Sequence, residues 1–95
     1  MANIRRLVLD TLKPHEPSII VLATELSDLE GVSAVNISIY EMDRKVENAK
    51  ITIEGENIIY GSVTQVIEDM GGAIHSIDEV VAGKRIIDDA VTLQG

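Results

Sequence analysis

The chain has 95 residues, 45% of them hydrophobic and 25% charged, so the sequence predicts one small folded domain and argues against a two-domain enzyme. Its 16 acidic residues outnumber its 8 basic residues, and the formal net charge of −8 excludes nucleic acid and anionic membranes as expected partners, because phosphate-rich ligands need a basic surface. The absence of cysteine excludes disulfide bonds and thiolate metal sites, and with no long apolar run we expect a cytoplasmic protein.

The first regular segment, residues 4–12, carries apolar residues on both alternating faces, which is typical of a strand at the centre of a sheet. Residues 13–17 contain two prolines and interrupt regular structure. Apolar residues then follow helical spacing over residues 19–29, which predicts an amphipathic helix of ten or eleven residues. Gly31 is the natural residue to end this helix in a left-handed conformation.

A hairpin follows, with one apolar and one polar face on each predicted strand, residues 35–40 and 49–54. The register that places every apolar residue on one face pairs Ile39 with Ala49, and a slip by one residue would destroy that match. The same register sets Glu41 opposite Glu47, and two carboxylates facing each other repel.

A second helix is predicted from the apolar face formed by Val63, Val66, Ile67 and Met70. Its start is left open: Asn57 could cap an early first turn, or a capping box at Ser62 could begin the helix later. Gly71 and Gly72 end this helix. A last strand is predicted over residues 73–81. Residues 1–83 are therefore expected to form the domain, and residues 84–95 a C-terminal tail that is either mobile or an arm onto a neighbouring subunit.

The order strand, helix, strand, strand, helix, strand predicts an α+β fold of the ferredoxin-like type, a split βαβ sandwich. It has a four-stranded antiparallel sheet, both helices on one face, and the first strand between the third and fourth. One face of the first strand would then be exposed to water on the helix-free side of the sheet. The exposed residues would be either Ile4, Val8 and Leu12, or Leu7 and Leu9. An exposed apolar stripe usually marks an interface, so we expect a homo-oligomer.

Four stretches resemble the small archaeal family called domain of unknown function two-eleven. They are VLDTLKPHEP (8–17), LEGVSAVNIS (29–38), KITIEGEN (50–57) and GGAIHSIDEVVAG (71–83). The resemblance covers residues 3–84. It implies a ferredoxin-like fold and ring-like homo-oligomers, but no function, because that family has no established activity.

One edge of the predicted sheet collects acidic and histidine side chains, because several strand ends meet there. These residues are Asp10, His15, Glu16, Glu41, Asp43 and Glu47, with His75 as a further candidate. Carboxylate oxygens suit a divalent cation such as calcium or magnesium, and histidines among them would also suit zinc. The alternative is a solvated edge neutralised by Arg44 and Lys45, which lie in the same turn.

The expected function is a non-enzymatic, homo-oligomeric module that binds a small ligand or a divalent cation, at this acidic edge or between subunits, and that could regulate a partner. One alternative is a structural or assembly protein whose acidic edge is solvated. Another is a small hydrolase or isomerase using His15 with Asp10 or Glu16. No phosphate-binding glycine motif is present, so nucleotide binding has no support from the sequence.

Overall fold

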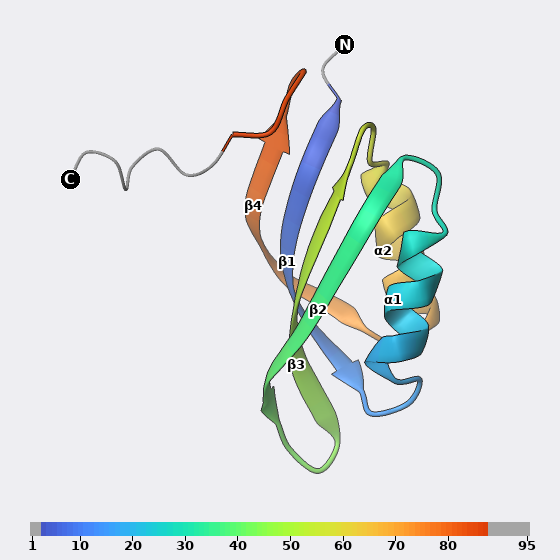
Figure 1. Ribbon diagram of the computed structural model, residues 1–95. Coiled ribbons are helices and arrows are strands. Elements are labelled where there is room, and N and C mark those ends of the chain that lie inside the picture. Colours follow the sequence, from blue (N-terminus) through green and yellow to red (C-terminus); the bar gives the residue numbers. More distant parts are fainter. Residues whose placement is uncertain (1–2, 88–95) are drawn as a thin grey trace, which may run out of the picture.

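The computed structural model describes residues 3–87 and contains four strands and two helices in these residues. The elements in chain order are β1 (Ile4–Pro14), α1 (Ile19–Ser27), β2 (Val32–Met42), β3 (Val46–Gly55), α2 (Tyr60–Asp69) and β4 (Ala73–Ala82). The strands pair antiparallel in the order β2-β3-β1-β4, and both helices lie on the same face of the sheet (Figure 1). The predicted ferredoxin-like fold and the position of β1 between β3 and β4 are therefore confirmed.

The β2–β3 hairpin has the predicted register over most of its length, since Ile39 pairs with Ala49. The register then shifts, and the next pairs along the hairpin are Glu41 with Asn48 and Met42 with Glu47. Tyr40 is left without a partner in a β-bulge, an extra residue that displaces everything after it by one position. The prediction that Glu41 faces Glu47 is wrong for this reason.

The two faces of β1 are covered differently. Leu7 and Leu9 point toward the helices and belong to the main core. On the helix-free face Val8 is only 8% exposed, and it lies between Thr52 on β3 and Glu79 on β4. The core consists of Leu7, Leu9, Leu22, Leu26, Ile51, Ile53, Ile58, Val63 and Ile67.

The predicted choice between two water-exposed sets on β1 is wrong in both forms. Leu7 and Leu9 are core residues, Ile4 packs against the core, and Leu12 is half-buried. Neighbouring strands on both sides of β1 shield its side chains, as a central position allows. The exposed apolar residues of the sheet lie instead mainly on its edge strands.

The helices end where glycines permit. Helix α1 ends at Ser27, a little earlier than predicted, and Gly31 has the expected positive φ of 89°. Helix α2 begins at Tyr60, between the two predicted starts, and buries Val63 and Ile67. None of the helices within residues 3–87 is long and apolar enough to cross a membrane. Residues 84–87 form no regular element, and the remainder of the predicted tail lies outside the described residues.

Two glycines allow the start of β2 and the end of β3 to touch. The Gly31 carbonyl oxygen accepts a hydrogen bond from the backbone N–H of Glu56 at 3.0 Å. A Cβ atom on Gly55 would overlap that carbonyl, and a Cβ atom on Gly31 would overlap the carbonyl oxygen of Asn57. This close backbone contact between Gly31 and Gly55 fixes the path of the chain from β3 into α2.

Candidate functional site

The end of β1 holds a buried ion pair that was not predicted. Strand β1 continues to Pro14, so Lys13 lies opposite Glu47 in register with β3. The Lys13 side chain is only 2% exposed, and its Nζ lies 3.1 Å from Glu47 Oε1 and donates a hydrogen bond to the Pro14 carbonyl at 2.7 Å. A buried charge is expensive unless it is paired, so Glu47 is needed to keep Lys13 inside.

His15 ties the loop after β1 to the β2–β3 turn. Its Nδ1 lies 2.9 Å from Glu47 Oε2, and its Nε2 lies 2.9 Å from the backbone carbonyl oxygen of Asp43. Both partners are acceptors, so both ring nitrogens donate only when the imidazole is protonated. The hydrogen bond to Glu47 raises the pKa of His15, and the same bond is the main cause that lowers the pKa of Glu47.

Three of the six predicted edge residues come together here, namely His15, Asp43 and Glu47. The Asp43 carboxylate accepts hydrogen bonds from the backbone N–H groups of Lys45 and Val46, which lower its pKa. In residues 3–87 no group of three or more histidine or acidic side chains is arranged to hold a metal ion. Lys13 and His15, rather than the predicted Arg44 and Lys45, balance the charge of Glu47.

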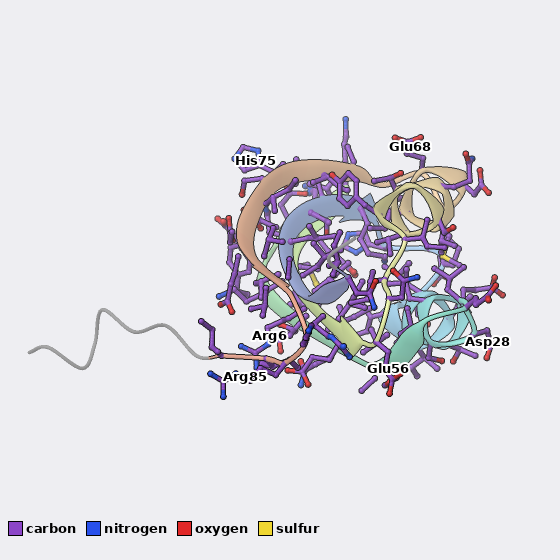
Figure 2. All side chains as sticks on the ribbon, turned by 90° about the horizontal axis from the view of Figure 1, so that it is seen from above. Arg6, Asp28, Glu56, Glu68, His75 and Arg85 are labelled. Carbon is purple, nitrogen blue, oxygen red and sulfur yellow. The ribbon has the colours of Figure 1, made fainter. Side chains whose placement is uncertain are left out.

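The other predicted residues lie apart from this cluster. Glu16 and Glu41 are exposed, and Asp10 lies in the middle of β1 on the helix-free face. His75 lies on β4 and points outward from the molecule (Figure 2). The predicted six-residue edge is therefore divided between a closed ion-pair cluster and separate surface positions.

The protonation of His15 predicts how stability depends on pH. A histidine whose pKa is raised in the folded state contributes stability below its ordinary value of 6.5, and that contribution is lost as pH rises through the folded-state pKa. We therefore expect the urea midpoint to fall as pH rises from about 6.5 to 8. The lowered pKa values of Asp43 and Glu47 act in the opposite direction, losing stability as pH falls below about 4.

The variant His15→Asn should remove most of the midpoint's fall above pH 6.5. His75→Asn is the matched control, because the His75 ring is exposed and makes no hydrogen bond within the described residues. A wild-type midpoint that rises or stays level from pH 6.5 to 8 would contradict this account of the His15 contacts.

A hollow of about 310 Å³ lies on the helix-free face and is lined by side chains from all four strands. The residues are Asp10 on β1, Ser38 and Tyr40 on β2, Lys50 on β3 and Asp78 on β4. Lys50 pairs in register with Asp10 on one side and with Ser38 on the other, which places all three on the same face. We call these five residues the helix-free hollow.

Two of these five residues sit at irregularities of the sheet. Tyr40 is the extra residue of the bulge in β2. In β4, Glu79 pairs with Val8 and Ile77 pairs with Leu9, so Asp78 is likewise left without a partner. Bulges re-aim side chains and are over-represented next to functional sites, so their coincidence makes this hollow a candidate binding site.

The two carboxylates of the hollow are each oriented by a hydroxyl group. Tyr40 donates a hydrogen bond to Asp10 Oδ1, and the carboxylate raises the pKa of the tyrosine. Ser76 donates to Asp78 Oδ1 at 2.7 Å. Within the described residues the second oxygen of each carboxylate makes no hydrogen bond, and the Lys50 ammonium makes no ion pair. These groups are free to bind a ligand.

Sequence reasoning found only Asp10 among the residues of the hollow. The alternation in β2 did indicate an open polar face that contains Ser38 and Tyr40. No pattern in the sequence marked the two bulges, which bring Tyr40 and Asp78 to the same place.

Comparison with known proteins gives a family but no activity. The chain matches the family model DUF211, described as uncharacterized ArCR, over residues 5–95. It is also 53% identical over 94 residues to the uncharacterized protein MJ0319 of Methanocaldococcus jannaschii. The aligned region covers 99% of this chain and 97% of that protein. The family match continues through residues 84–95, beyond the end of the resemblance seen in the sequence.

Proposed function

We propose that this chain, which belongs to the DUF211 family, is a non-enzymatic, homo-oligomeric module that binds a small ligand in the helix-free hollow. The family has no established activity. The observation that carries this proposal is the convergence of five polar side chains from four strands on one open hollow, two of them delivered by bulges. Small-ligand sites combine a concave surface with a few oriented polar groups, and the hollow has both features.

The acidic edge offers less to a cation than the sequence suggested. Both carboxylate oxygens of Glu47 already face basic groups, and Glu41 lies elsewhere on the hairpin. A calcium or magnesium ion is better served by the hollow, where Asp10 and Asp78 each keep one oxygen free of hydrogen bonds within residues 3–87. Both a small organic ion and a divalent cation therefore belong in the binding test.

Catalysis by His15 has little support. Both ring nitrogens are directed at protein oxygen atoms at 2.9 Å, so neither is directed at a position from which it could take a proton from a substrate. The ring instead holds two parts of the chain together, which supports the non-enzymatic reading.

Thermal unfolding tests the binding proposal, because a ligand bound only by the folded state raises the midpoint temperature as its concentration rises. At a ligand concentration of 100 times Kd the free energy of unfolding increases by about 2.7 kcal/mol. The protein is first treated with EDTA, then titrated separately with calcium, magnesium, and sets of amino acids, organic acids and amines. We expect at least one probe to raise the midpoint in wild type and in Glu41→Gln, but not in Asp78→Asn. Equal midpoints with every probe at millimolar concentration would overturn the proposal.

The homo-oligomer is proposed from the edge strands. Strands β2 and β4 each pair on one side only within the described sheet, so both expose backbone groups to a second copy of the chain. On β4, Ile77 is 49% exposed and Val80 is 51% exposed. Figure 1 shows the C-terminal half of β4 running beside β1 away from the helices. Burying these two side chains against a second copy of the chain would favour assembly through β4.

Sedimentation at micromolar concentration should therefore give the molar mass of at least two chains for the wild type. The double variant Ile77→Lys, Val80→Lys should fall to the mass of one chain, because it places two charges in the proposed contact. Ile20→Lys is the matched control, because Ile20 is 75% exposed but lies on α1. A wild type that sediments as a monomer would refute assembly, and a monomeric Ile20→Lys would move the contact to α1.

A further inference from the structure

We infer that the helix-free hollow recognises a basic amino acid, a small ligand with one carboxylate and two cationic nitrogens; this rests on the proposed function, because it names the ligand class of the same hollow. The inference comes from the arrangement of charges on the four strands, the orientation of the two carboxylates, and the small size of the hollow.

The charges of the hollow call for a ligand of mixed sign. Asp10 and Asp78 contribute two negative charges and Lys50 contributes one positive charge. The Lys50 ammonium has no ion-pair partner among residues 3–87, although Asp10 is its neighbour in register. A ligand with two ammonium groups and one carboxylate complements all three, and complementary charge is what gives a polar site its specificity.

The order of the strands gives the ligand a direction. Lys50 on β3 and Ser38 on β2 form one side of the hollow, while Asp10 on β1 and Asp78 on β4 form the other. Strands lie about 4.8 Å apart, so Lys50 and Asp78 are separated by two strand spacings. The ligand's carboxylate would therefore lie over Lys50 and Ser38, and its cationic nitrogens would lie over Asp10 and Asp78.

The orientation of the carboxylates fits two ammonium groups better than one metal ion. The Tyr40 and Ser76 hydroxyls each occupy one oxygen of Asp10 and Asp78, which leaves one oxygen per carboxylate to accept a hydrogen bond. A divalent cation prefers at least six oxygen ligands and would meet the Lys50 ammonium in the same hollow. A simple anion would meet two carboxylates.

Size limits the ligand as well. A hollow of about 310 Å³ is at the lower end of the range for small-molecule sites, so it suits a single amino acid and not a peptide or a nucleotide. The Tyr40 side chain takes up part of this space, because it reaches from β2 across β3 to its hydrogen bond with Asp10 on β1.

Isothermal titration of the full chain with three probes tests the inference. The probes are L-lysine, 1,5-diaminopentane, which lacks the carboxylate, and 6-aminohexanoate, which lacks the second ammonium group. We expect L-lysine to bind about tenfold or more tightly than either analogue, since a hydrogen bond to a charged group is worth at least that factor. Lys50→Met should remove the preference over diaminopentane, and Asp78→Asn should remove the preference over 6-aminohexanoate.

Glu41→Gln, an exposed change outside the hollow, should leave all three affinities unchanged. If diaminopentane or 6-aminohexanoate binds as tightly as L-lysine and Asp78→Asn abolishes that binding, the ligand class is wrong while the hollow remains the binding site. If L-lysine binds but neither Lys50→Met nor Asp78→Asn alters its affinity, the inference is overturned. If no probe binds at millimolar concentration, the inference that the ligand is a basic amino acid is refuted. The thermal unfolding screen then decides whether the hollow binds another ligand.

Discussion

Glu47→Ala is expected to destabilise the fold by about 3 kcal/mol, because removing one partner of a buried ion pair leaves the other charge buried and unpaired. The charge left behind is that of Lys13, which is 2% exposed and lies opposite Glu47 in the β1–β3 ladder. The same change removes the carboxylate that faces His15 Nδ1, so the loop after β1 keeps only the contact of His15 Nε2 with the Asp43 carbonyl in the β2–β3 turn. Urea unfolding at pH 6 measures the effect.

Glu41→Ala is the matched control on the same hairpin. Glu41 is exposed and pairs in register with Asn48 rather than Glu47, so the change should alter the free energy of unfolding by no more than about 0.5 kcal/mol. The double variant Lys13→Met, Glu47→Leu should recover much of the loss, because replacing a whole buried pair with apolar residues is often neutral. Equal unfolding free energies for Glu47→Ala and Glu41→Ala would contradict the buried pair.

Gly55→Ala is expected to destabilise the fold by about 3 kcal/mol, because overpacking against rigid backbone forces the chain to move. The new Cβ atom would overlap the carbonyl oxygen and carbon of Gly31, which is itself held by the hydrogen bond from Glu56. The overlap involves backbone on both sides, so no side-chain rotation relieves it. Thermal or urea unfolding of the purified variant measures the loss.

Gly61→Ala tests the same substitution where space is open. Gly61 lies in α2, and a Cβ atom there meets nothing within 4 Å. Alanine favours a helix over glycine by about 0.5–1 kcal/mol, so this variant should be more stable than the wild type. If Gly55→Ala were as stable as Gly61→Ala, the close approach of Gly31 and Gly55 would be refuted.

The fold was predictable because it follows from periodic apolar patterns. The alternation in the hairpin specified the pairing of Ile39 with Ala49, and the two apolar faces of β1 specified its place inside the sheet. Gly31 and Gly71 marked the helix ends, and both have positive φ in the structure.

The ion-pair cluster was missed because β1 was ended too early. Leu9, Thr11 and Lys13 share one face of the strand, so a strand continued to Pro14 would have carried Lys13 into the interior. A buried lysine requires a carboxylate partner, and the predicted hairpin offered Glu47. The signal was present in the spacing, but the prolines that follow obscured it.

The hollow was unpredictable for a different reason. A bulge inserts one residue into a ladder without a change in composition, so regular alternation hides it. The bulge at Tyr40 both separates Glu41 from Glu47 and brings a phenol to Asp10. The bulge at Asp78 adds the second carboxylate from a position 68 residues farther along the chain than Asp10. Such a meeting is a property of the folded sheet.

The central claim, that the helix-free hollow is the binding site, is tested most directly by mapping amide chemical shifts with the ¹⁵N-labelled protein during titration with L-lysine. The account predicts that the largest shifts occur at Ser38, Tyr40, Lys50 and Asp78, which line the hollow from three strands, and that they saturate together. Shifts confined to the turn between Asp43 and Glu47, or saturating shifts elsewhere that leave these four amides unmoved, would contradict it.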